Sequence, residues 1–177
     1  MYEAMKSLAE KGHRGQFRDA PKGDIPVPYI EHPKAVVKNL LDWGEPENSP
    51  AIGIAWGHDL LEDTETSDAE ILAASDETVL AGIRLLTRDD KVDKQLYMKE
   101  IARSGNREEL LVKLSDRIHN SRDRIRLKGL RDAFSYMHKA DCIFEAVCKL
   151  PADPVRENAI AAWRELDAFL RKEIHQE

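Results

Sequence analysis

The strongest constraint on this chain is an apolar run, residues 51–63, that carries four ionisable side chains toward its end. These are His58, Asp59, Glu62 and Asp63, and at about 100° per residue in a helix they share an arc of roughly 140°. A helix this apolar is expected to be buried, and buried carboxylates are costly unless they are paired or bound to a metal. The run therefore predicts a buried helix with a cation on one face.

Helical periodicity continues through most of the chain. Apolar residues recur every three or four positions in the segments 2–13, 33–43, 92–104, 107–128, 131–149 and 154–175, with shorter helices expected at 67–72 and 76–86. Gly12, Gly105 and Gly129 are expected to end helices, and Ser67 with Glu70 is expected to form a capping box at the start of another.

The segment 14–30 interrupts this pattern because it contains two glycines and three prolines. We expect a loop there, with room for a brief hairpin. Asp153 and Pro154 have the chemistry of an N-cap and a first helical residue, so the last helix should begin there. Strand-type alternation is nearly absent. The chain is therefore predicted to be all-α, a single compact helical bundle over residues 1–177.

Composition narrows the function classes. The net charge of −6 argues against a general nucleic-acid binder, while basic clusters at 11–22 and 113–128 fit a small anionic ligand, or else are solvated helix faces. No stretch approaches the roughly 18 apolar residues of a membrane span, and the first residues do not resemble a signal peptide. Cys142 and Cys148 lack metal-ligand spacing, so we expect free thiols and a cytoplasmic protein. The sequence does not indicate an oligomeric state.

Metal-type ligands recur at three places. His32 lies at the start of a predicted helix, His58 and Asp59 lie on the buried helix, and Asp116 shares a helix face with Asn120. Two imidazoles and two carboxylates suit a divalent first-row metal such as manganese, iron or zinc. Such a set leaves coordination positions open for water and substrate oxygens.

Longer phrases around these residues resemble a known family. They are GHRGQFR (12–18), PYIEHP (28–33), HDLLEDT (58–64), LTR (86–88) and VKLSDRIHN (112–120). The order His, His-Asp, Asp resembles the HD-domain metal-dependent phosphohydrolases, and the phrases resemble the hydrolase domain of RelA/SpoT-type enzymes over residues 8–150. We expect a stand-alone small alarmone hydrolase without a synthetase domain.

The resemblance implies an all-helical HD domain that is usually manganese-dependent. It implies hydrolysis of the 3′-pyrophosphate of ppGpp and pppGpp, giving GDP or GTP and pyrophosphate. The residues that match the family's metal ligands are His32, His58, Asp59 and Asp116, and those that match its catalytic acid pair are Glu62 and Asp63. The residues that match substrate-contacting segments are Arg14, Arg18, Lys113, Arg117 and Asn120.

Two departures from the family pattern keep alternatives open. The link 19–27 is several residues longer than usual, so the base is uncertain and an HD phosphohydrolase acting on another nucleotide or phosphorylated dinucleotide stays open. A non-catalytic nucleotide sensor is a third hypothesis, although retention of the acid pair argues against it. The second departure is Trp56-Gly57, which replaces the aliphatic pair expected before His58. Gly57, inside a predicted helix, costs roughly 1 kcal/mol relative to alanine, and close approach of another backbone would explain it. His119 is predicted to point away from Asp116 and has no assigned role.

Overall fold

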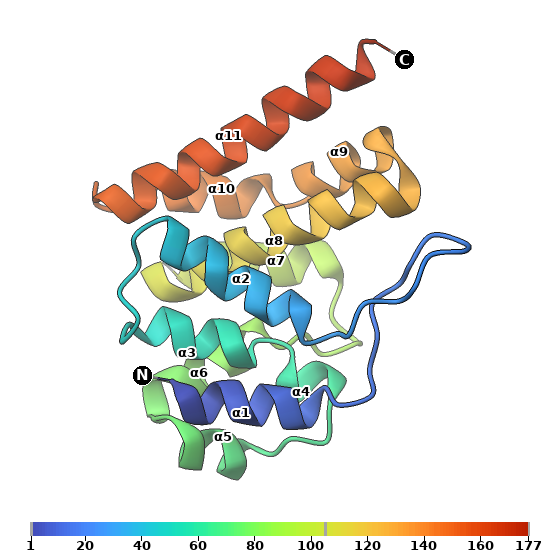
Figure 1. Ribbon diagram of the computed structural model, residues 1–177. Helices are drawn as coiled ribbons and strands as arrows, with labels where there is room; N and C mark the ends of the chain where they lie inside the picture. The colour runs from blue at the N-terminus through green and yellow to red at the C-terminus, as the bar shows by residue number, and fades with distance from the viewer. Residues whose placement is uncertain (1, 105, 177) are drawn as a thin grey trace.

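The computed structural model describes residues 2–104 and 106–176 (Figure 1), so the predicted helix stop at Gly105 lies outside the described residues. Over that part of the chain the regular structure is helical, without named strands. The helices are α1 (Glu3–Gly12), α2 (Glu31–Asp42), α3 (Pro50–Gly57), α4 (Leu60–Asp63), α5 (Asp68–Ala74), α6 (Glu77–Leu86), α7 (Lys94–Ser104), α8 (Arg107–Lys128), α9 (Leu130–His138), α10 (Asp141–Lys149) and α11 (Pro154–Ile174). The all-α prediction is confirmed.

Helix α8 is the centre of the bundle. It packs against α2, α3, α6, α7, α9, α10 and α11, and Leu111, Leu114 and Ile118 on it are fully buried. In Figure 1, α11 crosses one side of the molecule over α9 and α10, while α1 and α5 lie at the opposite end. None of the helices in the described part of the chain is long and apolar enough to cross a membrane.

The predicted helix starts are confirmed by their caps. The Ser67 hydroxyl accepts from the backbone N–H of Glu70, whose carboxylate accepts from the backbone N–H of Ser67. Asp153 caps α11 by accepting from the backbone N–H of Arg156 at 2.9 Å, and Pro154 follows as the first helical residue. Each such cap is worth about 1 kcal/mol of stability.

The segment 14–30 forms the expected loop with a brief hairpin, which projects from the body of the molecule in Figure 1. Its pairing is one isolated antiparallel bridge, Phe17 with Pro28. Arg18 donates its backbone N–H to the Val27 carbonyl at 2.8 Å, and Tyr29 donates to the Gln16 carbonyl at 2.9 Å.

Two predicted helices are each divided in the structure. The helix expected at 51–63 ends at Gly57 and restarts at Leu60, because Asp59 takes φ −105° and ψ −2°. The helix expected at 131–149 is broken around Ala140, which takes φ −113° and ψ 20°. Neither break contains a proline, and periodicity alone predicts a continuous helix through both.

Gly57 is explained by side chains and not by the backbone approach that we expected. A Cβ on Gly57 would lie 2.4 Å from Cδ1 of Ile83 and 2.7 Å from Cε of Met5. Both neighbours are fully buried. The helix therefore accepts glycine because α1 and α6 pack directly onto its last turn.

Candidate active site

Three chain segments bring the predicted metal ligands together. His32 lies in the first turn of α2, His58 and Asp59 form the break between α3 and α4, and Asp116 lies midway along α8. The ligand atoms of His32, His58 and Asp59 all lie within 4.8 Å of one another. The Nε2 atoms of His32 and His58 are 3.2 Å apart. Oδ2 of Asp59 lies 3.4 Å from Nε2 of His32 and 3.2 Å from Nε2 of His58.

Both imidazoles are held with Nε2 toward this cluster. Nδ1 of His58 lies 2.8 Å from the Ala55 carbonyl, which can only accept, so Nδ1 carries the proton and Nε2 presents a lone pair. His32 is 1% exposed and His58 is 2% exposed, and burial lowers the pKa of His32. Ring nitrogens and a carboxylate oxygen packed this closely are the donor arrangement that a divalent cation holds together. The donor set therefore fits a divalent metal.

Asp116 stands at the edge of this cluster. Its Oδ1 lies 3.3 Å from Nε2 of His32 and accepts from Nδ2 of Asn120, while its Oδ2 lies 3.0 Å from Nζ of Lys113. Burial raises the pKa of the Asp116 carboxyl, but Lys113 and His32 together hold that pKa well below its ordinary value. Asp116 is therefore an ionised carboxylate within reach of the two imidazoles.

Tyr29 links the metal-type ligands to the predicted acid pair, a contact that the sequence did not reveal. Its hydroxyl lies 2.8 Å from Oδ2 of Asp59 and 2.8 Å from Oδ2 of Asp63. Because one hydroxyl carries one proton, it donates to one carboxylate at a time. Glu62 accepts from the backbone N–H of Arg88 at 3.2 Å, and burial raises the pKa of its carboxyl.

His119 also has a place at the site that was missed. No role was predicted for it, but its Nδ1 lies 2.9 Å from Nδ1 of His32. Burial, and after it the neighbouring His32, lowers the pKa of His119 to about 4, so a neutral ring accepts the His32 Nδ1 proton. Such a partner fixes the tautomer and orientation of a metal-ligating histidine.

A cavity of about 350 Å³ opens from these residues and is lined by side chains of both charges. Its acids and imidazole are His32, Asp59, Glu62, Asp63 and Asp116. Its cationic side chains are Arg88, Lys94, Lys113, Arg117, Arg124 and Lys139. An anion that reaches the metal-type cluster would therefore have cations beside it.

Of the predicted substrate residues, Lys113, Arg117 and Asn120 line this cavity. Arg117 is 8% exposed; its Nη1 donates to the Tyr136 carbonyl at 3.3 Å, and its Nε has no hydrogen-bond partner among the described residues. Arg18 lines an adjoining cavity of about 300 Å³ that shares Tyr29, Asn120, Arg124 and Tyr136 with the first. Its guanidinium donates to Oδ1 of Asn120 at 2.6 Å. Arg14 is exposed and lines neither cavity.

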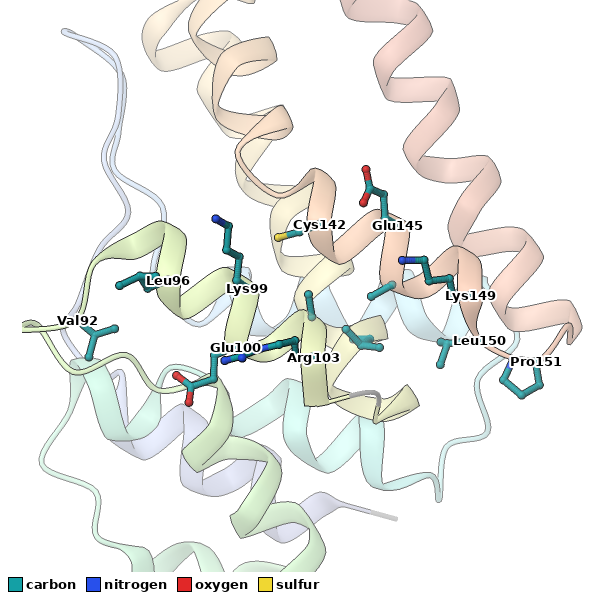
Figure 2. A pocket seen from close by; sticks show the side chains of 13 residues that line it. Val92, Leu96, Lys99, Glu100, Arg103, Cys142, Glu145, Lys149, Leu150 and Pro151 are labelled. Atoms are coloured by element: carbon teal, nitrogen blue, oxygen red, sulfur yellow. The ribbon is translucent and has the colours of Figure 1, made fainter.

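A larger cavity of about 930 Å³ lies elsewhere, between α7 and α10 (Figure 2). Its described lining combines apolar side chains such as Leu96 and Leu150 with Lys99, Glu100 and Lys149. None of the predicted site residues is among that lining, so size alone does not identify the site in this chain.

Comparison with known proteins gives a consistent picture. A scan against models of protein families finds no match. The chain is 33% identical over 126 residues to a guanosine-3′,5′-bis(diphosphate) 3′-pyrophosphohydrolase MESH1 from Danio rerio, which covers 70% of this chain and 68% of the relative. This chain belongs to that family. The MESH1 relative from Homo sapiens is 30% identical over 119 residues, which are 66% of this chain and 65% of that relative.

Longer proteins also match this chain. A GTP pyrophosphokinase from Streptomyces coelicolor is 32% identical over 127 residues, which are 68% of this chain but 14% of that protein. A solved structure, described as a metazoan ortholog of SpoT that hydrolyzes ppGpp, has a TM-score of 0.72 at 20% identity and covers 93% of this chain and 94% of its own. Family membership and the HD-domain all-α fold are thus confirmed.

Proposed function

We propose that this protein hydrolyses the 3′-pyrophosphate of ppGpp and pppGpp, giving GDP or GTP and pyrophosphate, as the names of its MESH1 relatives indicate for them. The carrying observation is a cavity that combines metal-type donors and an acid pair with six cationic side chains. A phosphorylated nucleotide is a small molecule whose phosphates such a lining can bind. We expect it to act in the cytoplasm.

His32, His58, Asp59 and Asp116 would hold the metal, for which Mn²⁺ is our candidate. When bound, a divalent ion supplies Lewis acidity, since it activates water and offsets the charge of a phosphoryl oxygen. Burial lowers the pKa of His32, and Lys113 with His32 holds the pKa of Asp116 well below its ordinary value, so both groups favour the form that binds a metal.

Glu62 and Asp63 are the proposed acid–base pair. Burial raises the pKa of Glu62 toward the working pH, which suits a group that takes a proton from water and returns one. The bond to be broken joins the ribose 3′ oxygen to phosphorus, so the pair would return the proton to that oxygen. The Tyr29 hydroxyl holds Asp63 toward Asp59 and so keeps the acid pair at the metal end.

The remaining predicted residues would bind the substrate. Lys113 and Arg117 would contact the phosphates nearest the acid pair, because both line the cavity beside Asp116. Asn120 would lie at the ribose 3′ side, where its amide already bonds Asp116 and Arg18. Arg18 and Arg14 would contact the nucleoside from the 14–30 loop.

The direct test is turnover of ppGpp. Purified protein with Mn²⁺ should release GDP and pyrophosphate, resolved by ion-exchange chromatography. The Glu62→Gln variant should lose about 10²- to 10⁴-fold in kcat, which is the usual worth of a general acid–base group. Glu100→Gln is the matched control, since Glu100 lines the other cavity. No turnover from protein shown by elemental analysis to contain metal would refute the proposal.

A second candidate is the same chemistry on another nucleotide. The long 19–27 link favours it, because Asp19 lies beside Arg18 in the adjoining cavity. A panel of nucleotides under the same conditions separates the two candidates by the ratio of kcat/KM. Tight ppGpp binding without hydrolysis, unchanged in Glu62→Ala, would instead indicate a sensor.

A further inference from the structure

Cationic side chains on one face of α8 line the active-site cavity. Lys113, Arg117 and Arg124 line it, spaced four and seven residues apart, so they follow one face of the helix. At a rise of 1.5 Å per residue, the backbone runs roughly 16 Å from Lys113 to Arg124. The cations that α8 contributes are therefore spread far enough along the helix to contact two separate anionic groups.

Arg117 and Arg124 both pack their guanidinium groups against the ring of Tyr136. The Cζ atom of Arg117 lies 4.0 Å from the centroid of Tyr136, and that of Arg124 lies 4.2 Å from it. Arg124 also forms an ion pair with Asp132 on α9. A guanidinium held in this way loses little conformational entropy when it binds an anion.

Two lysines enter the same cavity from other elements. Lys94 is the first residue of α7, and Lys139 follows the last residue of α9. Neither has an ion-pair partner among residues 2–104 and 106–176. Cations that line a cavity without counter-charges attract an anionic ligand. Lys113, by contrast, is already paired with Asp116 at the metal end.

We propose that Arg124, Lys139 and Lys94 form a second phosphate site, which holds the 5′-diphosphate of the substrate while its 3′-pyrophosphate reaches the acid pair. This inference rests on the proposed function and adds a specificity rule to it. Arg124 lies eight residues from Asp116, roughly 12 Å along α8, so it is too far along the helix to serve the phosphorus under attack. The three cations therefore select nucleotides that carry phosphate on both sides of the ribose.

The test compares two substrates that differ only at the 5′ end, ppGpp and guanosine 3′-diphosphate. Lys139→Met, Lys94→Met and Arg124→Met should each lose about 10- to 100-fold in kcat/KM on ppGpp, the usual effect of removing one charged hydrogen bond. On guanosine 3′-diphosphate the same variants should stay near wild type. Lys99→Met is the matched control, because Lys99 is on α7 but lines the other cavity.

Equal losses on both substrates would overturn the proposal, since the cations would then act on the scissile end or on folding. No loss on either substrate would overturn it as well. Binding measurements separate the second phosphate site from the proposed hydrolysis. In titration calorimetry on the Glu62→Gln background, Lys139→Met should weaken the binding of ppGpp and leave the binding of guanosine 3′-diphosphate unchanged. If wild type hydrolyses neither compound, the proposed function fails, and this binding difference alone decides for or against the second phosphate site.

Discussion

Replacing Gly57 with alanine should destabilise the protein although alanine is the better helix former. Alanine would gain roughly 1 kcal/mol of helix propensity. The added Cβ would lie 2.4 Å from Cδ1 of Ile83 and 2.7 Å from Cε of Met5, both of which belong to fully buried residues. Overpacking of this kind costs about 1–3 kcal/mol. Because both atoms are the ends of flexible side chains and can shift, we expect the middle of that range, and so a net loss of about 1 kcal/mol.

Urea unfolding measures this loss in free energy. In a chain of 177 residues the same loss should lower Tm by about 2–4 °C. Ile83→Val removes the closest atom, Cδ1, and alone should cost about 0.5–1.5 kcal/mol. The double variant should therefore lose clearly less than the sum of the single losses, because the alanine methyl then has room. A Gly57→Ala protein as stable as wild type, or strictly additive losses, would show that close packing is not the reason for glycine here.

Three further results are expected. Arg107→Met should lower the free energy of unfolding by about 2–3 kcal/mol in urea titrations, because it leaves the carboxylate of Glu45, a residue 4% exposed, without its cation. Arg107 also lowers the pKa of Asp153, so this pair stabilises the protein above the unfolded pKa of about 3.9, and the stabilisation is lost as pH falls. The difference in the free energy of unfolding between variant and wild type should therefore narrow below about pH 4, and a difference that widens there would contradict this. Tyr29→Phe should lower kcat about tenfold or more with little change in KM, since Tyr29 orients two carboxylates of the site, Asp63 among them; an effect confined to KM would argue for substrate binding instead. Chelation of the metal should lower Tm, and added Mn²⁺ should restore it, because the ion binds only the folded donor set; identical melting curves with and without metal would refute a metal site here.

The sequence predicted most of the ligand geometry because each ligand lies in a short phrase with its own helical context. His58 and Asp59 are adjacent, and Asp116 and Asn120 are one turn apart, so local periodicity suffices to orient them. The break between α3 and α4 was not predictable in the same way. It arises from tertiary packing, since no proline marks it and the glycine before it is one that neighbouring helices require.

Contacts between distant helices were the larger gap. Tyr29 reaches Asp59 across 30 residues, and His119 reaches His32 across 87. Periodicity places His119 on one face of its own helix, but it does not say which helix lies against that face. The structure supplies this, because α2 packs against α8. Residues that orient ligands, and not the ligands themselves, are what the sequence left undetermined.

The break at His58 and Asp59 resolves the conflict that the apolar run poses. Every residue of α3 from Ala51 to Gly57 is buried, so a continuous helix would carry the following carboxylates into the core unpaired. Ending α3 at Gly57 lets His58 satisfy the Ala55 carbonyl with one nitrogen and present the other to the cluster. The proposed acid pair then falls on α4, where both residues are exposed and line the cavity. A metal bound at this point would lie where core packing holds its proposed ligands rigid and solvent still reaches the acids, which is the arrangement that the proposed hydrolysis requires.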